Sequence, residues 1–231
     1  MNKLSFLHDD LQYMRTLCKN IFNDYKNKYI ELDKAQEMIT GYYVIWSNYY
    51  LEYKPLFEWL ASRKKIKIYK KKPKTVPFIY GTKFGLNNDN KPYYCCCSIY
   101  DEIYEEQFFI YDKFNQNELL LLFFHTKNGK MELEKIEIII INTVTGKIQY
   151  DYIYGYSKKL KPDDFPLKIE YEFNEKFIRD EYMYENDLVT QVRVTGDQNG
   201  IAKVVYKKNE VNFIGYTYDA LDCYRNFSIV E

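Results

Sequence analysis

Apolar side chains recur every three or four residues through the first fifty residues of the chain, which is the pattern of amphipathic helices. The first stripe predicts a helix from Ser5 to Lys28. The second predicts a helix from Asp33, with Gln36 in a capping-box position, to Tyr53. This second helix is apolar over more than half its girth, so we expect it to be packed on two sides. The stripes are Leu4, Leu7, Leu11, Met14, Leu17, Ile21 and Tyr25, then Ala35, Met38, Ile39, Tyr42, Ile45, Trp46, Tyr49 and Tyr53.

The clearest pattern in the rest of the chain predicts a β-hairpin. Ile136–Ile141 is an almost unbroken run of β-branched side chains, which is typical of a strand covered on both faces. Asn142–Gly146 supplies turn residues, and in the returning strand Tyr152 and Asp151 point to opposite faces. A second apolar run, Leu119–Phe124, is expected beside the isoleucine run.

Short β-type segments separated by turn residues fill the remainder, which favours an antiparallel meander. A turn at Glu175–Lys176 is expected, placing Phe173 opposite Ile178 and leaving an acidic stripe facing outwards. The predicted fold class is therefore α+β: an N-terminal helical hairpin packed on a large, curved, mostly antiparallel β-sheet, a meander of about ten strands. The other predicted strands are 76–80, 92–100, 103–112, 167–173, 177–185, 188–194, 201–207, 211–219 and 224–230.

The 231 residues are expected to form a single domain, 1–231, with a helical part (1–62) and a sheet part (63–231). No run of about 18 apolar residues predicts a membrane span, and the N-terminus lacks a secretory pattern. The five cysteines are odd in number, and three are consecutive, which favours reduced thiols. We expect a cytoplasmic protein.

Candidate chemistry is sparse. The triplet Cys95–Cys97 and His125 form the one metal-like grouping, but a zinc site needs four ligands and no second pair exists, so we expect no metal and no cofactor. His8 and His125 are the only histidines, and no phosphate-binding, dinucleotide-binding or hydrolase motif is present. The chain is predicted not to be an enzyme, although a carboxylate, tyrosine and histidine site on the sheet is kept as a third possibility.

Charge is strongly segregated in a chain whose net charge is zero. Residues 63–98 carry ten Lys/Arg against one Asp, whereas residues 163–231 carry eight Lys/Arg against fourteen Asp/Glu. The 26 tyrosines add candidate contact surface. The partner-binding residues predicted from these patterns are Arg63, Lys65, Lys67, Tyr69, Lys70, Lys71 and Lys72 in the basic stretch, with Glu170, Glu172 and Glu181 in the acidic stripe.

Two function classes follow from these patterns. The first is a non-catalytic protein-binding inhibitor, such as an immunity protein against a toxin or an inhibitor of a defence nuclease. The alternative is a nucleic-acid-binding protein that uses the basic stretch 63–74, where tyrosine lies among the lysines. Neutral net charge and the acidic second half favour the first class, because an acidic surface repels a phosphate backbone.

Overall fold

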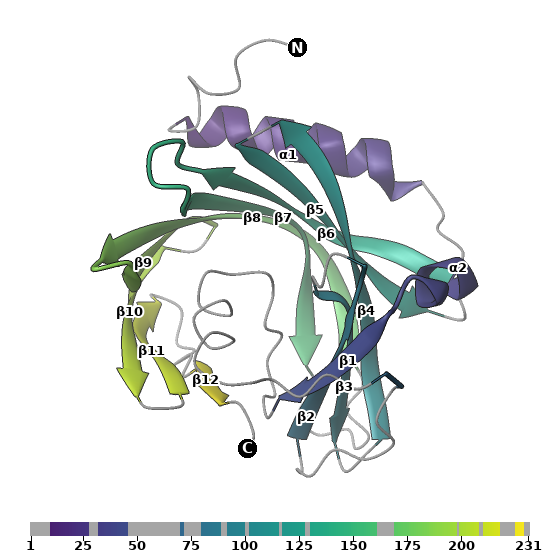
Figure 1. The fold of residues 1–231 in the computed structure, drawn as a ribbon. Coiled ribbons are helices and arrows are strands. Elements are labelled where there is room, and N and C mark those ends of the chain that lie inside the picture. Colours follow the sequence, from purple (N-terminus) through teal and green to yellow (C-terminus); the bar gives the residue numbers. More distant parts are fainter. Residues whose placement is uncertain are drawn as a thin grey trace.

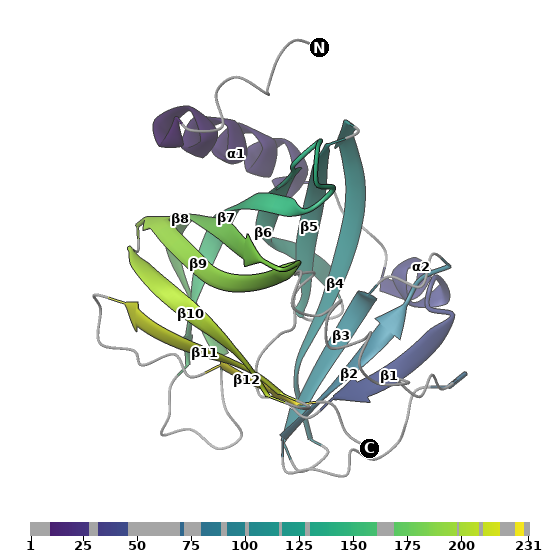
Figure 2. The ribbon, with the colours of Figure 1, turned by 60° about the vertical axis from the view of Figure 1, so that its left-hand side comes forward.

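The computed structural model describes residues 10–27, 32–45, 70–71, 80–88, 92–99, 102–115, 117–127, 130–160, 169–197, 199–207, 210–217 and 225–228. Within these residues, twelve strands form one antiparallel sheet in which each strand pairs with its neighbours in sequence. The sheet curves strongly, and helix α1 lies across its convex side (Figures 1 and 2). None of the described helices is long and apolar enough to cross a membrane.

All paired strands run antiparallel, as in a meander. The bounds of the helices and strands are α1 Leu11–Lys26, α2 Leu32–Glu37, β1 Gly41–Ile45, β2 Tyr80–Leu86, β3 Pro92–Ile99, β4 Glu102–Asn115, β5 Glu118–Lys127, β6 Lys130–Ile141, β7 Ile148–Leu160, β8 Ile169–Glu185, β9 Leu188–Gly196, β10 Gly200–Lys207, β11 Glu210–Thr217 and β12 Arg225–Ser228.

The predicted α+β class with a large antiparallel sheet agrees with the structure, but the helical hairpin does not form. Helix α1 is capped by the Asp10 side chain, which accepts a hydrogen bond from the Tyr13 amide (3.0 Å). The expected second helix ends after six residues, and Gly41–Ile45 pairs with β2 instead. A helix through this segment would hold Gly41 in its interior, and the Tyr-Tyr-Val-Ile sequence that follows fits a pleated strand better.

The predicted hairpin is confirmed as β6 and β7. Ile138 pairs with Tyr152 and Ile136 with Tyr154, and Leu120 on β5 lies opposite Ile138. Both faces of β6 are buried, because Ile138 and Ile139 point to opposite sides and each is 1% exposed.

The main hydrophobic core lies between α1 and the convex face of the sheet. Met14, Cys18 and Phe22 on α1 are buried against the tyrosines of β7. The Phe22 ring meets Tyr154 edge-on, with centroids 5.6 Å apart. Tyrosines of the predicted hairpin therefore form part of this core. Burial also raises the pKa of the Cys18 thiol, so it stays protonated and acts as a small apolar side chain.

The turn predicted at Glu175–Lys176 is wrong, because β8 runs unbroken through it. Ile178 pairs with Ile153 on β7, not with Phe173. Strand β7 pairs with β8 at both Glu175 and Lys176, so the backbone amide and carbonyl groups there have strand partners. The local sequence carries no signal for this pairing, because the partner is distant in the chain.

Charged contacts hold α1 at the margin of the core. Lys19 binds the Glu175 carboxylate (3.0 Å), which also accepts a hydrogen bond from the Tyr154 hydroxyl (2.6 Å). Arg15 binds Asp197 and stacks over the Phe177 ring, 5.2 Å from its centroid. Helix α1 is thus tied to β8 and to the residue that follows β9.

Gly155 permits an unusually close approach of β7 to β6. A Cβ at this position would lie 2.4 Å from the Glu134 carbonyl oxygen and 2.5 Å from the Lys135 Cβ. Glu134 is also the extra residue where the pairing of β5 with β6 shifts register. The irregularity in β6 therefore requires glycine on β7.

We expect Gly155→Ala to lower the free energy of unfolding by about 1–3 kcal/mol, because the new methyl group forces two strands apart. Urea unfolding followed by circular dichroism measures this change. Val144→Ala, at an exposed position, is the control and should change stability by less than about 0.5 kcal/mol. An unchanged unfolding midpoint for Gly155→Ala would contradict the close approach.

The contacts of α1 also predict a pH dependence. Hydrogen bonds from Tyr154 and Lys19 lower the pKa of Glu175. Burial raises the pKa of Asp197, but the bonds from Arg15 and from the Phe177 amide outweigh it, and the pKa is lowered. Both groups are less basic in the folded state, so their contribution is complete above their unfolded pKa values of about 4 and is lost as the pH falls through the lower folded values.

The double variant Glu175→Gln with Asp197→Asn should therefore melt below the wild type at pH 7, and the difference should shrink below about pH 4. Thermal melts between pH 7 and pH 2.5 measure this convergence. A difference that stays constant with pH would show that these carboxylates do not hold α1 through their charge.

Candidate protein-binding site

Ionisable side chains gather on the concave face of the sheet, opposite α1. Asp151 on β7 pairs directly with Asp180 on β8, and Glu137 lies one strand further on β6. Their exposed fractions are 1%, 9% and 0%, and that of Tyr182 is 6%. Burial, followed by the charges of Asp180, Asp151 and Glu137, raises the pKa of Tyr182 well above its usual value. These four groups therefore form one buried polar cluster.

A cation lies beside this cluster. The Lys135 ammonium is 3.2 Å from a Glu137 carboxylate oxygen and sits over the Phe123 ring, 4.2 Å from its centroid. Such a pair offsets part of the large cost of removing a carboxylate from water. Glu137, Asp151 and Asp180 are thus almost fully covered and lie together on the concave side of the sheet.

A second polar row follows β3, β4 and β5. Cys95 pairs with Gln107, which pairs with His125, so the cysteine and the histidine lie two strands apart. Gln107 donates to Glu134 (2.6 Å), and His125 Nε2 is 3.6 Å from Glu132. Within the described residues, no three acidic, histidine or cysteine side chains are arranged to hold a metal. The expectation that Cys95–Cys97 binds no metal stays a prediction.

The turn between β6 and β7 is fixed by its own polar groups. The Asn142 carboxamide oxygen accepts hydrogen bonds from the amides of Val144 (2.9 Å) and Thr145 (3.1 Å). The Asn142 backbone adds bonds to Lys147 and Gly146 (2.8 Å each), and Gly146 has a positive φ of 68°. Asparagine and glycine are the residues that this local geometry favours.

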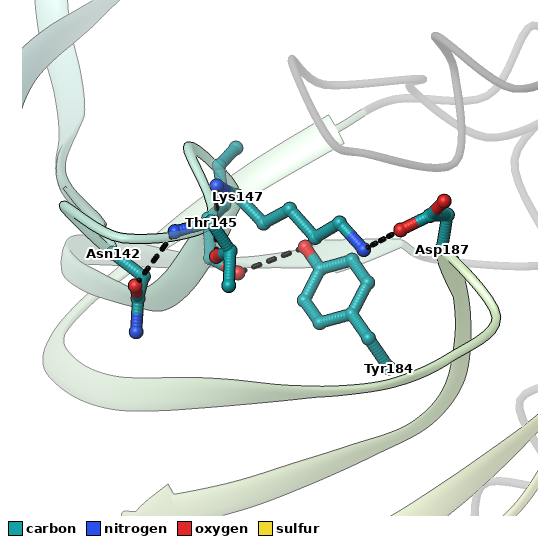
Figure 3. Close-up of polar contacts among 6 residues, drawn as sticks. Asn142, Thr145, Lys147, Tyr184 and Asp187 are labelled. Carbon is teal, nitrogen blue, oxygen red and sulfur yellow. Dashed lines mark hydrogen bonds and ion pairs between the residues drawn. The ribbon is translucent and has the colours of Figure 1, made fainter.

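The neighbouring turn between β8 and β9 is a tight two-residue turn. Its central residues, Asn186 and Asp187, have φ angles of 48° and 68°, as in a type I′ hairpin. Lys147 reaches across to Asp187 and lies over the Tyr184 ring, 4.9 Å from its centroid (Figure 3). The Tyr184 hydroxyl donates to the Ile148 carbonyl oxygen (2.8 Å). We call these two turns, 142–147 and 185–188, the locked hairpin end.

Val144 stands at the tip of the locked hairpin end with 91% of its surface exposed. The turn is held from its other side as well, since the Ile141 amide donates to the Asn117 carbonyl oxygen (2.7 Å). The turns that follow β4, β6 and β8 are thereby linked, and Val144 projects from the middle one. The arrangement can present a preformed contact to another molecule.

The predicted partner-binding residues are only partly described. Lys70 and Lys71 lie in an exposed bend, whereas the rest of the basic set, Arg63, Lys65, Lys67, Tyr69 and Lys72, lies outside the described residues. Register places Glu170 and Glu172 opposite Lys159 and Ser157.

The predicted acidic stripe is not one row, because the pairing of β7 with β8 shifts between Tyr156 and Ser157. Glu181 pairs with Tyr150 beyond this shift, and its side chain bonds Arg193 (3.4 Å).

The chain matches no protein-family model, no curated protein and no solved structure.

The turn Asn142–Gly146 is predicted by the sequence, but its partners Lys147, Tyr184 and Asp187 are not. The Asn186-Asp187 pair between two β-type segments is a hairpin signal that could have predicted the second turn. Nothing in the sequence indicates that the two turns touch, because that contact depends on how β7 and β8 pair.

Asn142→Ala should destabilise the protein by about 1–2 kcal/mol, because two turn amides lose their acceptor. The matched control is Asn142→Asp, which keeps an acceptor oxygen and should lose less. Chemical unfolding measures both variants. Equal losses for the two would show that the carboxamide oxygen does not hold the turn.

Proposed function

We propose that this protein is a non-catalytic, cytoplasmic protein-binding inhibitor, such as an immunity protein against a toxin or an inhibitor of a defence nuclease. The observation that carries the proposal is the locked hairpin end, which holds an exposed apolar side chain on a rigid support. A surface that is ordered before binding loses little conformational entropy when a partner docks.

The buried polar cluster supports the same reading. The groups best suited to acid–base chemistry, Glu137, Asp151 and Asp180, are covered and serve the interior of the sheet. General acid–base catalysis needs such groups within hydrogen-bond reach of a substrate. The exposed polar groups of the locked hairpin end instead form hydrogen bonds and an ion pair with one another, which suits binding of a partner protein rather than catalysis.

The alternative function is nucleic-acid binding through the basic stretch 63–74. Lys70 and Lys71 are exposed, as that function needs. Binding of this kind gains most of its affinity from counterion release and weakens steeply with salt. The chain has no net charge, and the acidic excess of residues 163–231 would oppose a phosphate backbone.

The decisive experiment purifies the tagged protein from its native host and tests the co-purifying protein for loss of activity when the chain is added. We expect a stoichiometric complex that survives about 0.3 M salt, because an apolar interface centre is screened less than its charged rim. If no protein co-purifies or none is inhibited, the proposal fails.

The variant Lys70→Glu/Lys71→Glu/Lys72→Glu separates the two functions. For an inhibitor, it should slow association with the target more than it speeds dissociation, as surface plasmon resonance can measure. Filter binding of labelled RNA and DNA is the companion measurement. Submicromolar retention at about 0.15 M salt, abolished by the triple substitution, would favour the nucleic-acid alternative.

A further inference from the structure

The locked hairpin end has the form of an anchor for a pocket. Val144 is 91% exposed, and hydrogen bonds to Asn142 fix the backbone on both sides of its side chain. Branching at Cβ restricts the χ1 angle of valine, so the side chain loses little rotamer freedom when it is buried by a partner. A protruding apolar side chain of fixed position is buried most favourably in a concave apolar site.

One basic and two acidic side chains belong to the same hairpin end as Val144. Lys147 is held by Asp187 and by the Tyr184 ring, whereas the Asp187 side chain is 90% exposed. The bond from Lys147 lowers the pKa of Asp187, so its carboxylate stays charged at neutral pH. A carboxylate has about four acceptor positions, and one lysine uses only part of them. Glu185, in the same turn, is also exposed. Because the Lys147 side chain is only 29% exposed, the accessible charges of this end belong mainly to Asp187 and Glu185, so the face that a partner meets is apolar at its tip and acidic at one side.

We propose that the target of this inhibitor is a folded protein that receives Val144 in an apolar pocket and places a basic side chain on the pocket rim against Asp187. This inference rests on the proposed function and deepens it by naming the contact surface. The acidic side of the hairpin end matches a cationic rim, and the rigid turns keep the two contacts in register. A nucleic acid offers neither an apolar pocket nor a cation, so a protein is the occupant that this surface favours.

The test measures the affinity of the purified, co-purifying target for four variants of the full chain. Val144→Ala should weaken binding about tenfold, because two buried methyl groups are lost. Val144→Asp should weaken it at least about a hundredfold, because a charge enters an apolar pocket. The paired exchange Lys147→Asp/Asp187→Lys keeps the internal ion pair but reverses its polarity, and it should slow association severalfold.

Ile201→Asp is the matched control, since it also places an acid at an exposed apolar position, 44% exposed, on β10. It should leave the affinity within about twofold of the wild type. Thermal melts of all variants check that each remains folded. A photoreactive amino acid at position 144, but not at position 201, should crosslink the target, giving a readout that does not depend on affinity.

The outcomes separate the two levels of inference. If Val144→Asp binds the target as tightly as the wild type, or position 144 forms no crosslink, the hairpin end is not the contact surface, and the inhibitor function still stands. If labelled RNA or DNA crosslinks at position 144, the proposed occupant is wrong. If no target protein exists, both proposals fall together.

Discussion

Burial of the isoleucine run of β6 on both faces is the constraint on which the rest of the structure depends. On one face of β6, Ile138 packs in the same core as the apolar stripe of α1. On the other face, Ile139 is buried on the concave side of the sheet. Because β6 lies in the middle of the twelve-strand order, neither face can be left to solvent. Each apolar side chain of this size gains about 1.5–3 kcal/mol when it is fully buried. Helix α1 and the tyrosines of β7 cover the convex face, and the curvature of the sheet encloses the concave face.

The concave face of the sheet buries charged and polar side chains among its apolar ones. Glu137 occupies a strand position between buried isoleucines, and its carboxylate is stabilised by Lys135, whose ammonium also rests on Phe123. The carboxyl groups of Asp151 and Asp180 lie on directly paired positions of adjacent strands, where the Cβ atoms of cross-strand neighbours are about 5 Å apart. Removing one partner of a buried ion pair such as Lys135 and Glu137 lowers stability by more than the pair itself contributes, because the other charge is left buried without a partner.

Rigid turns connect this interior to the proposed function. The pairing of β7 with β8 sets where Lys147 meets Asp187, and the hydrogen bonds of Asn142 set where Val144 points. A contact surface built on strand ends inherits the precision of the sheet, whereas a long loop would have to be ordered during binding. The same strands that bury the core therefore determine the geometry of the exposed tip.

Features that depend on local pattern could be predicted from residue order alone. The periodic stripe around Met14 predicted α1, and the run Ile136–Ile141 with the turn Asn142–Gly146 predicted the central hairpin, because burial on one or two faces is reflected directly in residue order. Features that depend on partners distant in the chain could not be predicted in this way. Gly41–Ile45 became a strand because β2 pairs with it, although its apolar spacing also fits a helix. β8 runs through Glu175–Lys176 because β7 satisfies its backbone. The cluster of Glu137, Asp151 and Asp180 and the contact of Lys147 with Asp187 arise from register alone, and a one-residue shift of register would separate their members.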